Sequence, residues 1–212
     1  MTSTLSPPKV RPDEHFVLRN VGWELYEMLL KEIGDRPIHI TFDQGDLELM
    51  SPLPEHERWK RTIGRLIELL SLERSIPIGS LGSTTFRRKD LAKGLEPDEC
   101  YYIQHESAVR GKKRIELPAD PPPDLAVEID ITHREIDRES IYAALGVPEI
   151  WVFDGQRLSA MVLREGKYRA SETSAAFPFL KVADLERFIG MVEKTDETTV
   201  MRAFRDWVRG LK

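Results

Sequence analysis

One stretch of the chain, from Pro123 to Asp154, constrains the fold more than any other. In its opening segment, DLAVEIDI, large apolar side chains alternate with acids and one alanine. This pattern is typical of a strand with one apolar and one polar face. The segment EIWVFD is almost continuously apolar, as in a sheet covered on both sides. Between them, ESIYAALG predicts a short helix that ends at Gly146, with Pro148 just beyond. Strand, helix and strand in this order predict a parallel pair with a right-handed crossover.

Two acids, Glu128 and Asp130, fall inside the first of these strands. Because successive side chains of a strand point to opposite faces, residues two apart share a face. The pattern therefore predicts that Glu128 and Asp130 emerge together, while Leu125, Val127 and Ile129 enter a core. Two carboxylates on one face at the edge of such a unit could form a metal site.

The composition is that of a globular protein: the 212 residues are 41% hydrophobic and 32% charged. No apolar run is long enough to span a membrane, and the N-terminus lacks the apolar core of a secretory signal, so we expect no membrane partner. Cys100 is the one cysteine, which rules out an internal disulfide and favours a cytoplasmic location.

The formal net charge of −5 counts modestly against a protein that coats itself with nucleic acid. It leaves room for a local basic channel. Two clusters of cations are candidates, and solvated loop charge explains each cluster taken alone as well. They are Arg87, Arg88, Lys89 and Lys93, and Arg110, Lys112, Lys113 and Arg114.

The rest of the chain divides into a loose N-terminal arm at 1–19, a main domain at 20–181 and a C-terminal helical extension at 182–212. We expect the extension to pack on the domain or on a partner subunit. Apolar periodicity predicts the remaining elements. They are a helix at 22–34, a hairpin turning at Gln44-Gly45, a helix at 55–74, a strand at 78–86, a loop at 104–123 and a second hairpin turning at Glu165-Gly166.

Four acids, Glu48, Asp98, Glu128 and Asp130, lie in predicted strands, where Asp and Glu are disfavoured. A solvent-facing position explains any one of them, but the coincidence of four favours a metal site. Mg²⁺ prefers carboxylate oxygen and keeps several waters, so two or three acids suffice. Phosphate-binding glycine loops, zinc-protease and serine-hydrolase motifs are absent from the sequence. The five histidines are scattered along it.

Several segments together resemble the bacterial family of putative restriction endonucleases with a PD-(D/E)XK nuclease core. They are EPDECYYI, PDLAVEIDIT, the helix containing Tyr142, GVPEIWVFD and GDLELMSPLPEHE, and the resemblance covers about residues 20–180. It implies an α/β, restriction-endonuclease-like fold with a mixed central sheet flanked by helices. It also implies hydrolysis of DNA phosphodiester bonds with Mg²⁺, for which Mn²⁺ can substitute. A homodimer is expected, because two subunits most simply cut two strands.

The resemblance also implies roles for individual residues. Asp98 takes the place of the aspartate in P-D, and Glu128 takes the place of the first acid in (D/E)-x-K. Glu48 corresponds to an additional acid upstream. Asp130 stands where the motif has lysine, and the basic group moves to Arg138, four residues before Tyr142. Asp98 and Glu128 would hold the metal, Glu48 and Asp130 a second ion or a water, and Arg138 the scissile phosphate. Arg87, Arg88, Lys89 and Tyr142 are the candidates for substrate binding.

Two other functions stay open. The first is a non-catalytic module that keeps the nuclease fold for DNA binding or protein interaction, in line with the missing lysine. Metal-dependent turnover would argue against it. The second is hydrolysis of RNA or of a nucleotide phosphodiester by the same carboxylates, which a panel of substrates would distinguish.

Overall fold

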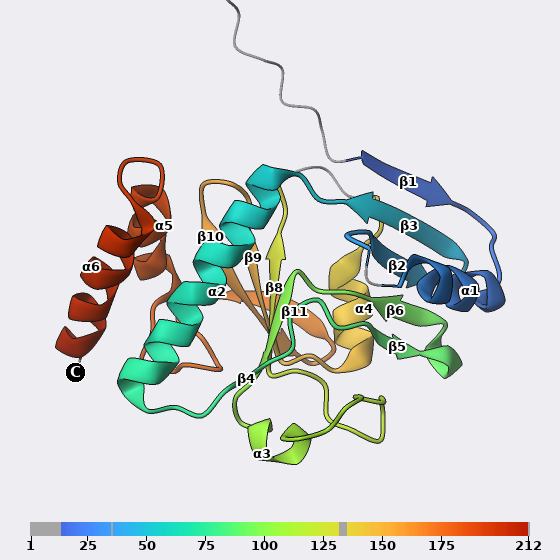
Figure 1. Cartoon of the computed structure of the whole chain (residues 1–212). Coiled ribbons are helices and arrows are strands. Elements are labelled where there is room, and N and C mark those ends of the chain that lie inside the picture. Colours follow the sequence, from blue (N-terminus) through green and yellow to red (C-terminus); the bar gives the residue numbers. More distant parts are fainter. Residues whose placement is uncertain (1–13, 35, 132–134, 212) are drawn as a thin grey trace, which may run out of the picture.

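The computed structural model describes residues 14–34, 36–131 and 135–211, and these form two β-sheets with helices packed around them (Figure 1). The first sheet has, in spatial order, β1 (Glu14–Leu18), β3 (Asp46–Ser51), β2 (His39–Asp43), β6 (Lys93–Leu95) and β5 (Phe86–Arg88). The second sheet has β11 (Lys167–Ser171), β10 (Leu158–Arg164), β9 (Glu149–Phe153), β8 (Leu125–Ile129), β7 (Glu99–Tyr102) and β4 (Gly79–Ser80). The helices are α1 (Trp23–Ile33), α2 (Pro54–Arg74), α3 (Glu106–Val109), α4 (Arg138–Leu145), α5 (Glu186–Met191) and α6 (Glu197–Gly210), with 3₁₀ turns η1 (Lys89–Leu91) and η2 (Val182–Leu185).

The strand–helix–strand unit predicted from the sequence forms the centre of the second sheet. β8 and β9 pair in parallel, with Ala126 opposite Ile150, and α4 connects them. The helix ends at Gly146, whose φ of 82° lies in the left-handed region that glycine tolerates best. The other strand pairs of the described sheets are antiparallel, so the second sheet is mixed. The predicted α/β fold with a mixed sheet is confirmed.

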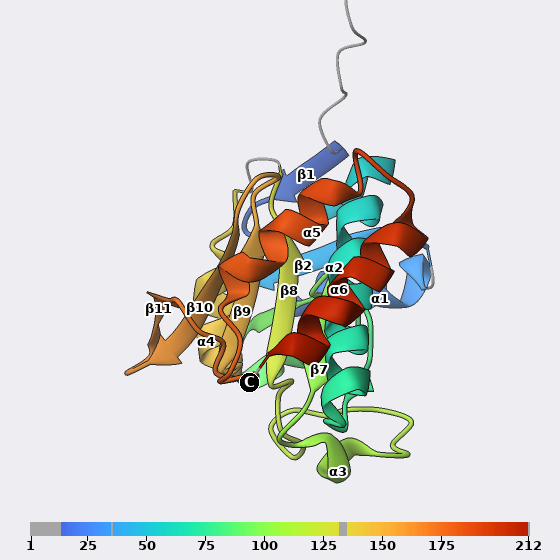
Figure 2. The same cartoon turned by 90° about the vertical axis from the view of Figure 1, so that its left-hand side faces the viewer.

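The second sheet is covered on both faces, which is why every residue of β8 is buried. Leu125, Val127 and Ile129 point to one face and pack with α2, α5 and α6. Ala126 and Ile150 point to the other face and pack with α4. Figure 2 shows α2, α5 and α6 gathered on one side of the strands. Each large apolar side chain buried in this way contributes roughly 1.5–3 kcal/mol to stability.

The C-terminal helices share their core with α2 and the second sheet. Phe188 of α5 and Phe204 of α6 are buried, and their ring centroids lie 5.0 Å apart in an edge-to-face arrangement. Both belong to the same apolar cluster as Ile63 and Leu66 of α2. α6 lies beside α2 in both views (Figures 1 and 2). Within residues 182–211, therefore, the chain packs on the main domain.

The first sheet carries α1 on one face. Trp23 and Tyr26 of α1 pack against Phe42 of β2, with ring centroids 5.4 and 5.1 Å from the Phe42 ring. β2 and β3 form the predicted hairpin, and its turn contains Gln44 and Gly45, both with positive φ. The opposite face of this hairpin, which contains Thr41 and Glu48, is therefore not the face that α1 covers.

Two predictions about local structure were wrong. The single strand predicted at 78–86 is two short strands in different sheets: β4 pairs with β7, and β5 pairs with β6. The segment between them leaves one sheet for the other, which apolar periodicity cannot reveal. Residues Glu14–Leu18 of the predicted loose arm form β1, because their backbone pairs with β3. Residues 1–13 of that arm lie outside the described residues.

The predicted loop at 104–123 is largely irregular and contains the short helix α3. The second hairpin forms from β10 and β11, as predicted. Across the residues that the structure describes, no helix combines the length and apolar character needed to cross a membrane.

Candidate active site

Asp98, immediately before β7, and Glu128, in the neighbouring strand β8, lie at the same end of the second sheet. In the antiparallel pair of β7 and β8, Glu99 lies opposite Val127 and Cys100 opposite Ala126. Asp98 comes immediately before β7, next to the Glu99–Val127 pair, and Glu128 is on the face of β8 that contacts Arg138 and Tyr142 of α4. Asp98 is 0% exposed and Glu128 is 5% exposed. Buried carboxylates are costly unless they are paired or hydrogen-bonded, so both acids require nearby partners.

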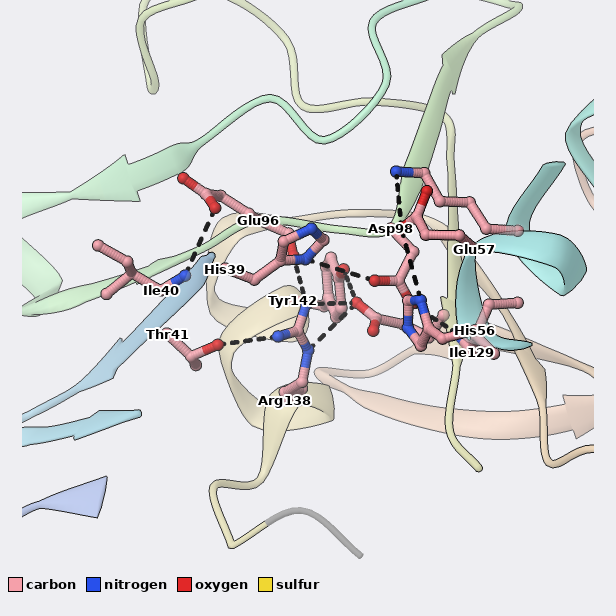
Figure 3. A network of polar contacts seen from close by, with 12 residues as sticks. His39, Ile40, Thr41, His56, Glu57, Glu96, Asp98, Ile129, Arg138 and Tyr142 are labelled. Atoms are coloured by element: carbon pink, nitrogen blue, oxygen red, sulfur yellow. Dashed lines mark hydrogen bonds and ion pairs between the residues drawn. The ribbon is translucent and has the colours of Figure 1, made fainter. Parts of the chain in front are cut away.

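Asp98 is held by the backbone of β8 and lies against two histidines (Figure 3). Its Oδ2 accepts a hydrogen bond of 2.7 Å from the Ile129 N–H. Oδ2 also lies 3.2 Å from Nε2 of His56, near the start of α2. Its Oδ1 lies 3.4 Å from Nδ1 of His39, on β2. Three elements far apart in the sequence therefore surround one carboxylate.

Burial lowers the pKa of His39 to about 4, and the positive charges of Arg138 and Lys60 act in the same direction against the opposing effect of Asp98. The imidazole is therefore neutral at physiological pH. A neutral imidazole can orient a carboxylate without adding a full positive charge to the site.

Glu128 is held by two residues of α4. Its Oε1 accepts hydrogen bonds from Arg138, at 2.6 Å from Nη2 and 3.2 Å from Nε, and one from the Tyr142 hydroxyl. Arg138 and Tyr142 lie one helical turn apart, and the guanidinium carbon is 6.0 Å from the Tyr142 ring centroid. Asp137 begins the helix, since its side chain accepts a hydrogen bond from the Ser140 N–H.

The remaining Arg138 hydrogen bonds reach the first sheet. Nη1 donates to Thr41 Oγ1 at 2.8 Å, and Nη2 donates to the Glu96 carbonyl at 2.6 Å (Figure 3). Burial alone would lower the pKa of Arg138, but the charge of Glu128, the hydrogen bond to it and smaller contributions from neighbouring groups together outweigh burial and raise the pKa, so the guanidinium stays charged. Burial and the Glu128 charge also raise the pKa of Tyr142 well above its usual value, so its hydroxyl remains a donor.

Glu48 lies beside this cluster. It is buried on β3, directly opposite Thr41 of β2, whose hydroxyl accepts the Arg138 hydrogen bond. Its Oε1 accepts a hydrogen bond of 3.4 Å from the Glu135 N–H. The structure thus brings the upstream acid of the sequence prediction to the Arg138 side of the site.

Asp130 lies just past the end of β8 and is exposed. With Glu128, Arg138 and Tyr142 it lines a pocket of about 240 Å³. Glu128 and Asp130 therefore border one pocket, as the alternation predicts. They differ in burial, because Glu128 is covered by α4 whereas Asp130 lies beyond the strand.

The predicted substrate-binding cations lie on the edge of the first sheet. Arg87 and Arg88 are in β5, and Lys89 begins η1. Each contacts an acid: Glu27 lies 3.4 Å from Arg87, Asp90 accepts two hydrogen bonds from Arg88, and Glu24 lies 4.0 Å from Lys89. Arg87 and Lys89 also line a groove of about 760 Å³ that contains Lys113 and Arg114 of the second basic cluster. The groove brings residues of both clusters together.

Sequence reasoning missed His39, His56 and Thr41 as residues of the site. The five histidines look scattered along the chain, yet two of them meet at Asp98. The sequence offers one signal for His56, because this residue is the second-to-last of the family-like segment GDLELMSPLPEHE. Nothing in the local sequence of His39 distinguishes it from a core histidine.

Comparisons with known proteins give the family of the chain. The family model Uma2, described as putative restriction endonuclease, matches residues 23–208. The chain belongs to this family. Among solved structures it is similar to a putative nuclease of the DUF820 group from Anabaena variabilis, at 11% sequence identity and a TM-score of 0.48, covering 80% of this chain and 90% of that one. No curated protein matches the chain. Family membership confirms the resemblance and makes a nuclease the expected class of activity.

Proposed function

We propose that this member of the family is a metal-dependent nuclease that hydrolyses phosphodiester bonds in DNA. The observation that carries the proposal is that two buried carboxylates, Asp98 just before β7 and Glu128 in the neighbouring strand β8, both act on the charge of Arg138. A fold that needed only stability would avoid this arrangement, since nearby buried like charges repel. A bound divalent cation would convert that repulsion into binding.

The residues suit Mg²⁺ in donor type. Mg²⁺ binds carboxylate oxygen, uses one or two protein carboxylates and fills its remaining positions with water and substrate phosphate. Within the described ranges, no group of three or more His, Cys, Asp or Glu side chains is arranged to hold an ion. Asp98 and Glu128 would therefore hold the ion with water completing its shell, Glu48 is the candidate third acid, and Mn²⁺ would substitute.

A divalent ion held there would lower the pKa of a bound water and offset negative charge that develops on the phosphate. The chain's own residues keep the two acids in place. The Ile129 N–H and His56 fix Asp98, while Tyr142 and Arg138 fix Glu128. Asp130, at the mouth of the adjoining pocket, is the candidate to position the attacking water.

Arg138 receives a different role in this proposal from the one expected from the sequence. Its guanidinium donates to Glu128, Thr41 and the Glu96 carbonyl, so contact with a phosphate would require breaking some of these hydrogen bonds. We therefore assign Arg138 and Tyr142 as positioning residues for Glu128. Breaking a buried charge pair of this kind costs roughly 3–5 kcal/mol, which favours a fixed guanidinium.

One observation favours the alternative of a non-catalytic module. Oε1 of Glu128 already accepts hydrogen bonds from Arg138 and Tyr142, so an ion would have to share this oxygen or bind the other one. In a module of this kind Arg138 would be the permanent countercharge, and DNA binding would not depend on metal. Homodimer formation stays a prediction under both functions.

The test is a titration of Mg²⁺ and of Mn²⁺ into the purified protein by calorimetry, with plasmid cleavage measured in parallel. The variant is Asp98→Asn/Glu128→Gln, and the control is Asp184→Asn, which removes one exposed carboxylate of η2. We expect the wild type and the control to bind metal and cut DNA, and the double variant to do neither. Cleavage by the double variant would refute the site, and metal-free DNA binding without cleavage would support the module. Single-stranded DNA, RNA and a nucleotide diester complete the substrate panel.

A further inference from the structure

One groove concentrates positive charge on a molecule whose formal net charge is −5. It has a volume of about 760 Å³ and is lined by α1, the edge strand β5 with its flanking residues, Glu96 and the loop at 110–123. Cations outnumber acids in its lining, whereas acids outnumber cations in the whole chain. We call it the basic groove. Its cations are Lys31 of α1, Arg87 and Lys89 at β5 and η1, and Lys113 and Arg114 of the loop.

Three of these cations have no acidic partner. Among the residues that the structure describes, Lys31, Lys113 and Arg114 form no ion pair, and all three are exposed. Arg110 and Lys112 of the same loop each pair with an acid, and neither lines the groove. The positive charge that the loop leaves without a counterion is therefore concentrated along the basic groove.

The fold fixes the backbone that carries Lys113 and Arg114. The next residue, Ile115, packs against the apolar cluster formed by residues of β7 and α4. Asp120 is buried and accepts a hydrogen bond of 2.8 Å from the Glu116 N–H, which closes the following turn. Groups that are already held in place bind a ligand at a lower entropic cost. The two cations are thus presented to the groove by an ordered segment.

Glu96 connects the basic groove with the proposed metal site. Its carboxylate accepts a hydrogen bond of 2.6 Å from the Thr85 hydroxyl, and both residues line the groove. Its backbone carbonyl lies 2.6 Å from Nη2 of Arg138, the nitrogen that also donates to Glu128. Figure 3 shows the Glu96 carboxylate pointing away from Asp98. Because two residues separate them in sequence, the Cα atoms of Glu96 and Asp98 are at most about 7 Å apart. The groove and the site therefore adjoin at Glu96.

The chemistry of the groove suits a phosphodiester chain. Lysine and arginine supply donors without acceptors, and an arginine can bind two phosphate oxygens at once. Cations spread along a groove match a ligand that carries a negative charge at every repeat. We propose that the basic groove binds the sugar-phosphate backbone of the DNA substrate beside the bond that is cut. The inference rests on the proposed nuclease function, because the adjoining site would hold the scissile phosphate.

The cations at β5 take different parts in this binding. Arg87 lies 3.4 Å from Glu27, and the two side chains are 45% and 43% exposed. Ion pairs between exposed side chains are weak, so Arg87 can exchange Glu27 for a phosphate. Arg88, which the sequence also indicated for substrate binding, donates two hydrogen bonds to Asp90 and does not line the groove. Arg87 therefore belongs to the proposed binding surface, whereas Arg88 does not.

The first experiment compares Lys113→Met/Arg114→Met with Arg110→Met/Lys167→Met, which removes the same charge from exposed positions outside the groove. The affinity for two duplexes of unrelated sequence is measured in EDTA over a range of salt concentrations. Loss of two phosphate contacts should reduce the slope of log affinity against log salt by about two in the groove variant. Its affinity in about 0.1 M salt should fall at least about tenfold. The loss should be equal for both duplexes, since phosphate contacts carry no sequence information.

The control variant should keep the wild-type slope, and so should Lys113→Arg/Arg114→Lys, which retains both charges. Melting temperatures of all the variants should match that of the wild type, because the substituted side chains are exposed. An unchanged slope in the groove variant would overturn the inference. Equal reductions in the groove and control variants would overturn it as well, since net charge alone would then explain them.

Cleavage kinetics distinguish a binding groove from catalytic residues. In single-turnover reactions, the groove variant should need at least about ten times more protein for its half-maximal rate, with a maximal rate within about twofold of the wild type. A loss confined to the maximal rate would contradict a binding role. If the wild type binds DNA but never cleaves it, the proposed function fails, and the salt slopes still test the groove. Unchanged slopes in a protein that cleaves would count against the groove alone.

An acidic peptide is the other class of ligand that cations attract, and poly-glutamate serves as its probe. We expect DNA to displace poly-glutamate from the wild type at low salt. If the groove variant lost affinity for poly-glutamate but kept its full affinity for DNA, the groove would be a peptide site and the inference would be wrong. A wild type that binds no DNA in EDTA at low salt would refute it too.

Discussion

Two buried glutamates on adjacent strands show why burial of an acid does not by itself mark a site. Glu149 of β9 is 0% exposed and accepts hydrogen bonds from the Trp151 indole, the Ser174 hydroxyl and the Ala176 N–H. All three donors are neutral. Its neighbour across the antiparallel pair is Val162. Glu149 therefore anchors the segment around 174–176 to the sheet, and no second charge is involved in these contacts.

Glu128 of β8 differs in each of these respects. An arginine holds it, a second buried carboxylate, Asp98, comes just before the neighbouring strand β7, and Glu128 borders a pocket. A single buried acid with neutral donors is a structural anchor, whereas Glu128 shares its surroundings with a guanidinium and a second buried acid. This gathering of charged groups, and not burial alone, is what favours a cation site.

The largest expected difference between the two glutamates is catalytic. Glu128→Gln should lower Mg²⁺-dependent cleavage by about 1,000-fold or more, since it removes a proposed metal ligand. Glu149→Gln should retain the wild-type rate per folded molecule. The measurement is single-turnover cleavage at a protein concentration corrected for the folded fraction. Equal losses in the two variants would mean that the comparison reflects stability alone.

The next largest expected effect is the loss of stability on removal of the Arg138 guanidinium. Arg138→Met should lower the free energy of unfolding by about 3–5 kcal/mol, because it leaves Glu128 buried without its charge partner. Arg202→Met, on the exposed surface of α6, should change it by less than about 0.5 kcal/mol. Urea unfolding with and without Mn²⁺ provides the measurement.

Metal should stabilise Arg138→Met more than the wild type, since the ion would then be the main countercharge for the two acids. If Mn²⁺ shifts the melting temperatures of both proteins equally, the ion does not bind at these acids. That result would favour the non-catalytic module.

The smallest expected effect is the pH dependence of the stability that Glu149 contributes. Burial raises its pKa above the ordinary value of 4.5, despite the three hydrogen bonds. An acid whose pKa is higher in the folded state contributes fully below its unfolded pKa, and loses that contribution as pH rises through its folded pKa. The stability advantage of the wild type over Glu149→Gln, about 1–3 kcal/mol, should therefore shrink as pH rises from 4.5. Unfolding curves of both proteins at a series of pH values test this, and a difference that grows with pH would contradict it.

The sequence by itself determined the local elements and the two carboxylates. Alternation in DLAVEIDI, apolar periodicity from Pro54 to Arg74 and the glycine that ends α4 are local signals, because helix and strand periods act on neighbouring residues. Asp98 and Glu128 could be singled out because acids inside apolar strands are costly without a reason. The same argument singled out Glu48 and Asp130, and the family-like segments added Arg138.

Only the tertiary structure decided what surrounds those carboxylates. The pairing of β7 with β8 brings the Asp98 end of one strand beside the Glu128 end of the other, and the packing of β2 and α2 brings His39 and His56 to Asp98. The packing of β2 against α4 likewise supplies Thr41 to Arg138. Register and packing arise from contacts between residues distant in sequence. The periodicity of a single segment therefore cannot predict these long-range contacts.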